Sequence, residues 1–283
     1  MVEQIRITRG KPSGRAPPNE SVSSKREFFV ELARGAGSII KHDFYLPKTA
    51  ETKSDGSPVT KTDKRINQIV ITEVRRRYPE YNILSEESNP LNQQSIYTVV
   101  CDPLDGTGNF LKGIPNCCFS IAFEINGRPF ISVQYDPFTD RMLYAEMGNG
   151  SFLNGKTVKL STDKNLKGST VGLDLWKGMQ FDLNNLKYYL EENGTKLTNG
   201  PMVFMGIELA CGNISAFVHP ARMPYESAAS VLITEEAEGM SNDMFGNNQR
   251  YDGRIKGCVV SNGLVHNELM GFVRKHVKFP YKP

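Results

Sequence analysis

The sequence predicts an α+β protein in which a helical and antiparallel first half precedes an α/β second half. Apolar residues recur at helical spacing twice before residue 79, and strand signals then crowd residues 97–155. After residue 165, strand-like and helix-like stretches alternate, as they do in α/β units. This change of pattern divides the chain into two subdomains, and the cleft between two such halves is a frequent place for a binding site.

The first half is expected to begin with a polar tail and two helices. Residues 1–24 are rich in Arg, Gly, Pro and Ser, which is typical of a disordered tail. Apolar spacing predicts one helix from about Ser24 to Tyr45. A second helix is expected to begin at Asp63 and to end before Pro79, and taken alone Asp63 is typical of an N-cap.

The middle of the chain is expected to form an antiparallel sheet. A short apolar strand is predicted at residues 97–101, and the Asn-Gly pair at 126–127 predicts a hairpin between strands 117–125 and 128–135. A strand at 141–146 extends this sheet. In the second half, strands are expected near residues 169–174, 202–205, 214–218 and 257–261, and helices near 182–192, 206–212, 226–238 and 264–275.

The composition is that of an ordinary globular protein. The 283 residues are 39% hydrophobic and 23% charged, and a net charge of +3 is too balanced to favour a nucleic-acid partner. The five cysteines have an irregular spacing that favours free thiols, so we expect a reducing compartment and a cytoplasmic protein. No apolar run reaches the length of about 18 residues that spans a membrane, so no membrane partner is expected.

The most informative motif is the acidic run DPLDGT at residues 102–107. It follows a predicted strand, so Asp102 and Asp105 emerge in a bend shaped by Pro103 and Gly106. Converging carboxylates repel each other unless a cation lies between them, and oxygen ligands suit Mg2+, Mn2+ or Ca2+ rather than Zn2+. The N–H groups at the start of a following helix suit a phosphate. The alternative is an acidic turn that only caps a helix.

Three segments carry a resemblance to a known family, namely residues 53–63, 84–88 and 99–110. In order and approximate spacing, they resemble the inositol monophosphatase superfamily, which includes bisphosphate nucleotidases and some fructose-1,6-bisphosphatases. The resemblance implies a layered α-β-α-β-α sandwich of the sugar-phosphatase type, a homodimer, inhibition by Li+ and a requirement for two or three Mg2+ ions. Residues 25–165 would form the metal-binding subdomain with its antiparallel sheet, and residues 166–283 the α/β subdomain that closes the active-site cleft.

The resemblance also implies a set of metal ligands. Glu86 would bind the first metal and help to orient the attacking water, although taken alone it is an ordinary surface charge. Asp102 would bridge two metals, and the carbonyl group of Leu104 would complete the first site. Asp105 would bind the second metal.

The water and the substrate are assigned in the same way. The resemblance implies that Thr107, hydrogen-bonded to Asp63, activates the water, and that the N–H groups of Gly106 and Thr107 bind the phosphate. Lys53 would contact substrate or an outer metal, or it is simply a solvated loop lysine.

The sequence departs from the family pattern at two positions. The family usually carries Trp-Asp before a late helix, and that Asp binds the second metal, whereas this chain has Tyr225 and Glu226. The extra methylene moves the carboxylate by about 1.5 Å on a fixed backbone, so we expect a second metal that is displaced, weakened or replaced by Mn2+. Alternatively, Glu226 only places a charge at a helix N-terminus. His219 stands where some relatives carry an acidic residue for substrate hydroxyls, so a substrate contact is expected there too.

These features predict a metal-dependent phosphoric monoester hydrolase that attacks a small phosphorylated metabolite with an activated water. Inositol monophosphate or a sugar phosphate is favoured as the substrate. Two alternatives remain. The version of the motif at residues 55–60 favours a 3'(2'),5'-bisphosphate nucleotidase, and the departures at Glu226 and His219 favour a non-catalytic, phosphatase-like binding protein.

Overall fold

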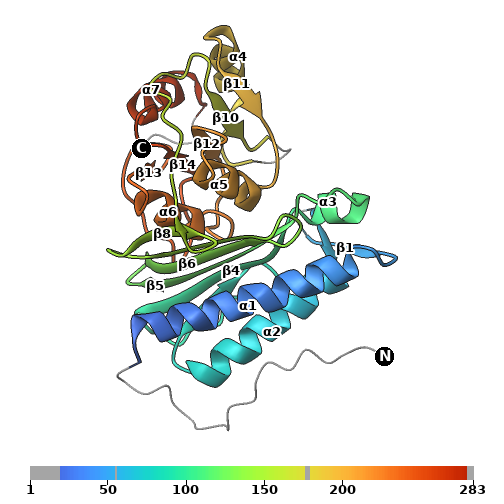
Figure 1. The fold of residues 1–283 in the computed structure, drawn as a ribbon. Coiled ribbons are helices and arrows are strands. Elements are labelled where there is room, and N and C mark those ends of the chain that lie inside the picture. The colour runs from blue at the N-terminus through green and yellow to red at the C-terminus, as the bar shows by residue number, and fades with distance from the viewer. Residues whose placement is uncertain (1–19, 55, 176–178, 279–283) are drawn as a thin grey trace.

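Two β-sheets and three layers of helices alternate in the computed structural model of the chain (Figure 1). The structure describes residues 20–54, 56–175 and 179–278. The expected α-β-α-β-α sandwich is confirmed. Within the described ranges, no helix is both long enough and apolar enough to cross a lipid bilayer.

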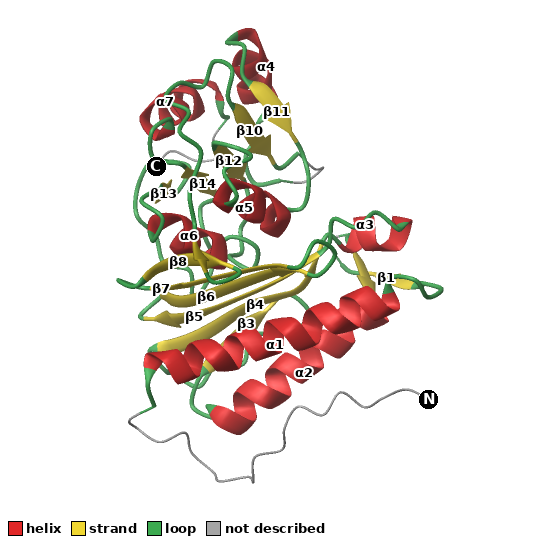
Figure 2. Ribbon diagram, in the orientation of Figure 1, coloured by secondary structure: helices red, strands yellow, loops and turns green. Residues whose placement is uncertain are grey.

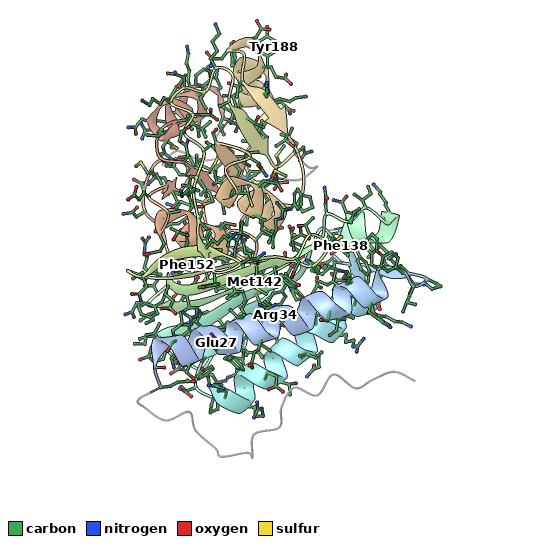
Figure 3. The ribbon with its side chains drawn as sticks, in the orientation of Figure 1. Glu27, Arg34, Phe138, Met142, Phe152 and Tyr188 are labelled. Carbon is green, nitrogen blue, oxygen red and sulfur yellow. The ribbon has the colours of Figure 1, made fainter. Side chains whose placement is uncertain are left out.

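The outer layer of the first half consists of α1 (Val22–Asp43) and α2 (Lys61–Arg77). Both helices pack their apolar faces on one side of the first sheet, while Glu27 and Arg34 lie exposed on α1 (Figure 3). Most of the expected tail, residues 1–19, lies outside the described residues. The tail was expected to extend to residue 24, which is too far. Val22 to Ser24 already form the first turn of α1, and the side chain of Ser21 caps this helix.

The beginning of α2 positions a candidate site residue. Thr60, not Asp63, is the N-cap, and Asp63 occupies the third helical position. The hydroxyl of Thr60 accepts a hydrogen bond from the N–H of Asp63, and the carboxylate of Asp63 accepts one from the N–H of Thr60 at 2.8 Å. This reciprocal capping box holds one carboxylate oxygen of Asp63 and leaves the other available for a second contact.

The first sheet has seven strands in the order β3-β4-β5-β6-β7-β8-β9. The strands are β3 (Asn82–Ser85), β4 (Tyr97–Asp105), β5 (Cys118–Ile125), β6 (Arg128–Asp136), β7 (Arg141–Glu146), β8 (Gly150–Leu153) and β9 (Lys156–Thr157). All neighbours are antiparallel except β3 and β4, which run parallel. The expected Asn-Gly hairpin joins β5 to β6. A separate two-stranded sheet pairs β1 (Ala50–Thr52) with β2 (Pro58–Thr60).

The second sheet has five strands in the order β11-β10-β12-β14-β13. The strands are β10 (Thr170–Leu173), β11 (Lys196–Thr198), β12 (Ala216–His219), β13 (Met240–Asn242) and β14 (Cys258–Ser261). The three-residue strands β11 and β13, both at sheet edges, were not expected from the sequence. The last strand of the first sheet ends at Thr157, and the first strand of the second sheet begins at Thr170.

The central helical layer lies between the two sheets (Figure 2). It consists of α5 (Met202–Ala210) and α6 (Ala228–Glu235), while α4 (Asn184–Glu192) and α7 (His266–His276) cover the outer face of the second sheet. The strand predicted at 202–205 was wrong, because these residues form the first turn of α5. The run from Met202 to Ala210 is almost wholly buried, and a short apolar run lacks the periodicity that separates a buried strand from a buried helix.

One buried acid in the first sheet has no evident role in catalysis. Glu124 on β5 is fully buried, and neither carboxylate oxygen has a hydrogen-bond partner in the described part of the chain. Burial, together with the charge of Asp252, raises the pKa of Glu124 well above its ordinary value. Folding therefore favours the protonated form of Glu124.

We expect the substitution Glu124→Gln to raise Tm at pH 8 relative to wild type, by an amount that shrinks towards pH 5. In the unfolded chain the Glu carboxyl ionises above a pKa of about 4.3, so folding of wild type must take up a proton at higher pH. The free energy of unfolding therefore falls by up to about 1.4 kcal/mol per pH unit until the raised folded pKa is reached. The amide cannot ionise and escapes this loss.

Thermal unfolding of both proteins between pH 5 and 8 measures the effect. The exposed residue Glu31 on α1 provides the control, since Glu31→Gln should shift Tm equally at every pH. A Tm difference for Glu124→Gln that does not change with pH would contradict a neutral buried carboxyl group.

Candidate active site

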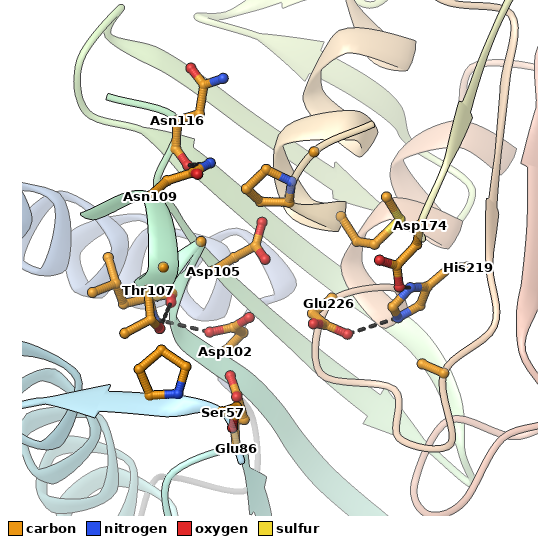
Figure 4. A pocket seen from close by; sticks show the side chains of 18 of the residues that line it. Ser57, Glu86, Asp102, Asp105, Thr107, Asn109, Asn116, Asp174, His219 and Glu226 are labelled. Carbon is orange, nitrogen blue, oxygen red and sulfur yellow. Dashed lines mark hydrogen bonds and ion pairs between the residues drawn. The ribbon is translucent and has the colours of Figure 1, made fainter. Parts of the chain in front are cut away.

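The acidic run lies at the C-terminal end of β4, where the backbone leaves the first sheet. β4 extends to Asp105 rather than ending at Cys101, and its register with β5 shifts between Asp102 and Asp105. Asp102 is buried, and its Oδ1 accepts a hydrogen bond from the N–H of Leu104 at 3.0 Å. This irregular strand end brings both aspartates to one side of a cleft (Figure 4).

Asp105 joins the two subdomains. Its Oδ2 accepts hydrogen bonds from the N–H groups of Val203 at 2.8 Å and Phe204 at 3.3 Å, in the first turn of α5. These N–H groups have no partner within the helix, and the helix dipole favours a negative charge at this end. A carboxylate from the first half thus caps a helix of the second half.

Three carboxylates converge from the two subdomains. Single oxygens of Asp102, Asp105 and Glu226 all lie within 4.8 Å of one another. Burial and the mutual repulsion of these charges raise the pKa of Asp102 and of Asp105 well above the ordinary value. Glu86 directly follows β3 and lines the same cleft as these three carboxylates. Burial raises the pKa of Glu86 to about 7.

Lys53 partly balances the charge of this set. Its ammonium group lies 2.7 Å from Oε1 of Glu86 and 2.5 Å from Oε1 of Glu87. Lys53 therefore pairs with two carboxylates. Whether it also contacts substrate, as expected from the sequence, stays a prediction.

A hydroxyl–carboxylate pair lies beside the aspartates. Thr107, the first residue of α3 (Thr107–Lys112), donates a hydrogen bond from its Oγ1 to Oδ1 of Asp63 at 2.9 Å. The same hydroxyl lies 3.1 Å from the carbonyl oxygen of Leu104. The expected hydrogen bond between Thr107 and Asp63 is thus present, and the capping box fixes Asp63 from behind.

His219 and Glu226 lie on the opposite wall. His219 ends β12 and is almost fully buried, with Nδ1 at 2.9 Å from Oδ2 of Asp174 and Nε2 at 2.7 Å from Oε2 of Glu226. Burial alone would lower the pKa of His219, but the two carboxylates raise it to about 10. The ring therefore carries a positive charge at neutral pH. Asp174 was not singled out from the sequence, although its place directly after β10 is where α/β sheets commonly present site residues.

The cleft that contains these groups has a volume of about 790 Å3. Its lining includes the expected residues Glu86, Asp102, Leu104, Asp105, Gly106, Thr107, His219 and Glu226. Sequence reasoning missed the three amide side chains of Asn109, Asn116 and Asn199, which also line it. Asn109 lies in α3, and Asn116 and Asn199 lie in loops. Single Asn residues at such scattered positions carry no pattern that would have identified them.

The donor set fits a hard divalent cation. All three clustered ligand atoms are carboxylate oxygens, which suits Mg2+ or Mn2+ better than Zn2+. Oδ2 of Asp102 is buried and has no hydrogen-bond partner within the described ranges. A buried charged oxygen without a partner is costly, and a cation at this point would remove that cost.

Comparison with known proteins identifies the family. Residues 22–278 match the model of the inositol monophosphatase family, so the chain belongs to that family. The Nus factor SuhB of Escherichia coli is 32% identical over 225 residues, which cover 77% of this chain and 84% of that protein.

Two matches from Thermotoga maritima, one of sequence and one of structure, extend the comparison. The fructose-1,6-bisphosphatase/inositol-1-monophosphatase is 28% identical over 258 residues, covering 89% of this chain and 96% of that protein. The structure of an IMPase has a TM-score of 0.79 at 26% identity, covering 89% of this chain and 97% of that one. Family and relatives together support phosphatase activity and a small phosphorylated substrate.

We expect Gly106→Ala to lower Tm by about 4–20 °C. Gly106 has a φ of 83°, and an added Cβ would lie 2.5 Å from the carbonyl oxygen of Asn116 and 2.9 Å from Cγ of Pro201. The left-handed backbone costs a non-glycine residue about 1–2 kcal/mol, and the close contacts cost about 1–3 kcal/mol more. Each kcal/mol of lost stability lowers Tm by about 2–4 °C for a chain of this size.

Gly108→Ala is the matched control. Gly108 lies two residues further along in α3, and an added Cβ would meet no atom within 4 Å. Alanine is the better helix former, so this variant should match or exceed the wild-type Tm. Equal losses of Tm in the two variants would show that the tight turn at Gly106 is not the cause.

Proposed function

We propose that this chain hydrolyses a small phosphomonoester by direct attack of a water molecule, with Mg2+ as the cofactor. The observation that carries the proposal is the convergence of Asp102, Asp105 and Glu226 beside the hydrogen-bonded pair of Thr107 and Asp63. Metal-assisted phosphate hydrolysis needs both a carboxylate cage and a group that receives a proton from water.

Metal binding is assigned to five residues. Glu86, Asp102 and the carbonyl group of Leu104 would hold the first ion, and Asp102, Asp105 and Glu226 the second. Bound there, the ions supply positive charge to the phosphate oxygens and lower the pKa of water. A third ion, and Mn2+ in place of Mg2+, belong to the same proposal, as does inhibition by Li+.

Thr107 and Asp63 receive the proton. The single hydroxyl hydrogen of Thr107 is directed to Asp63 and Leu104, which leaves the oxygen lone pairs to accept a hydrogen bond from a water molecule in the cleft. As that water attacks phosphorus, the bond from phosphorus to the ester oxygen breaks, and the departing alcohol oxygen takes up a proton from solvent water. The proton of the attacking water passes to Thr107 while the hydroxyl proton of Thr107 passes to Asp63. The N–H groups of Gly106 and Thr107 would hold the phosphate.

An inositol or sugar monophosphate is the proposed substrate. The amides of Asn109, Asn116 and Asn199 line the cleft together with the carboxylate of Asp174, and such groups bind hydroxyls. A carboxylate on this wall also repels a second phosphate, which disfavours the alternative 3'(2'),5'-bisphosphate nucleotidase.

A second candidate function is a non-catalytic binding role. It is favoured by the departures at Glu226 and His219 and by the likeness to a relative named as a Nus factor. A nucleic-acid partner would belong to this alternative rather than to the phosphatase. Against it, the buried carboxylates repel one another strongly, and a protein without a metal to bind gains nothing from gathering them.

Two further properties complete the proposal. A homodimer rests on the family resemblance. A cytoplasmic location rests on the cysteines, all five of which are free, and four of which are buried.

We expect wild type to release phosphate from inositol-1-phosphate in the presence of Mg2+, and Asp102→Asn to lose at least about 100-fold of kcat. Thr107→Val should lose about 100- to 1000-fold because it keeps the shape of threonine but lacks the hydroxyl. Thr107→Ser, which restores the hydroxyl, should recover most of the rate. A phosphate-release assay with Mg2+ and Mn2+ measures all four proteins.

A panel of substrates decides among the alternatives. It adds 3'-phosphoadenosine-5'-phosphate, fructose-1,6-bisphosphate and NADP to inositol-1-phosphate. Preference for a bisphosphate would overturn the proposed substrate class, and phosphate release from none of them with either metal would favour the binding protein. Equal rates for Thr107→Val and Thr107→Ser would remove Thr107 from the proton path.

A further inference from the structure

The two departures from the family pattern contact each other. His219 and Glu226 are seven residues apart in the sequence, at the end of β12 and just before α6, yet Nε2 of His219 lies 2.7 Å from Oε2 of Glu226 (Figure 4). Each residue alone looks like the loss of a family feature. Together they form an ion pair on the wall of the cleft.

A third residue fixes the imidazole ring. Nδ1 of His219 lies 2.9 Å from Oδ2 of Asp174, so the ring is held on both edges by carboxylates. The His219 side chain is only 2% exposed, and rotation about its bonds would break both contacts. The three residues come from the end of β10, the end of β12 and the segment before α6, so the fold sets their positions.

Glu226 needs such a restraint more than an aspartate would. Glutamate has one more rotatable bond, and loss of that freedom on ordering costs free energy. The contact with His219 occupies one carboxylate oxygen, while an oxygen of Glu226 lies within 4.8 Å of Asp102 and Asp105. The contact with His219 can thereby hold the longer side chain of Glu226 in one position.

The backbone at Glu226 is fixed as well. Nε2 of Gln134 on β6 donates to Oγ of Ser230 on α6 at 2.7 Å, and that hydroxyl lies 3.5 Å from the carbonyl oxygen of Glu226. The first turn of α6 is thus tied to the first sheet, and the side chain of Glu226 is the remaining freedom that His219 removes.

We propose that His219, oriented by Asp174, is a positioning residue that fixes Glu226 as a ligand of the second metal ion. The inference rests on the metal site of the proposed function, and it reassigns His219 from substrate contact to support of a metal ligand. Partners that orient a metal ligand in this way commonly contribute 10- to 100-fold to metal affinity.

Calorimetric titration with Mn2+ in the absence of substrate tests the proposal. The second site is defined as the Mn2+ equivalent that Glu226→Ala weakens or removes. We expect His219→Ala to raise Kd of this equivalent about 10- to 100-fold and to leave the other equivalent unchanged. His219→Gln should recover part of the affinity, because its amide can still donate to Glu226. Asp174→Asn should weaken the same equivalent to a smaller extent.

A double-mutant comparison separates positioning from a general structural effect. In the Glu226→Ala background, His219→Ala should cause no further loss of Mn2+ binding, since the residue it positions is gone. Far-UV circular dichroism and Tm confirm that each variant is folded, and His219→Gln replaces His219→Ala if the latter is not.

Other outcomes overturn the inference. One such outcome is a folded His219 variant that binds the Glu226-dependent Mn2+ equivalent with the wild-type Kd. Another is a wild type that has no Glu226-dependent equivalent. A rise of KM with intact Mn2+ binding would place His219 on the substrate. Because the titration contains no substrate, a wild type that binds Mn2+ as expected but hydrolyses no phosphomonoester would refute the proposed function alone.

Discussion

Repulsion among clustered carboxylates is the constraint on which the rest of this structure depends. Asp102 and Asp105 are buried, Glu226 is partly exposed, and one oxygen of each lies within 4.8 Å of the others. Two of these carboxylates have a compensating partner of their own. A helix N–H group donates a hydrogen bond to Asp105, and the imidazolium of His219 pairs with Glu226. Oδ2 of Asp102 is buried and has no hydrogen-bond partner among the described residues. A cation bound at this oxygen would therefore relieve electrostatic free energy.

The same constraint ties the two subdomains together. The carboxylate that caps α5 comes from the first subdomain, and α6, which follows Glu226, packs against the first sheet. An ion pair of 2.6 Å between Arg141 on β7 and Glu208 on α5 adds a second bridge. Because the cluster is assembled from both halves, a metal ion bound there would stabilise their association as well as the site itself. A substitution at the interface would then change metal affinity even where it touches no ligand.

The sequence and its family resemblance singled out most of the acidic residues that meet in the cleft, but they failed where contacts between distant segments decide the structure. The run at 102–107 indicated a carboxylate cage, because its order of residues alone forces a bend with two acids. The segment at 202–205 was misassigned as a strand, since the cap that begins α5 is Asp105, almost 100 residues away in the chain. Asp174 could not be paired with His219 before the order of strands in the second sheet was known. The edge strands β11 and β13 are too short to show an alternating pattern.

The ion pair of His219 and Glu226 also changes the charge of the cleft wall. The imidazolium of His219 lies there between the carboxylates of Asp174 and Glu226. The net charge of these three side chains is then −1, because the raised pKa of His219 keeps its ring protonated at neutral pH. Asp174 and Glu226 both line the cleft, and His219 contacts both of them. A substitution at His219 would therefore act at the same time on the proposed metal ligand and on the carboxylate proposed to bind substrate hydroxyls.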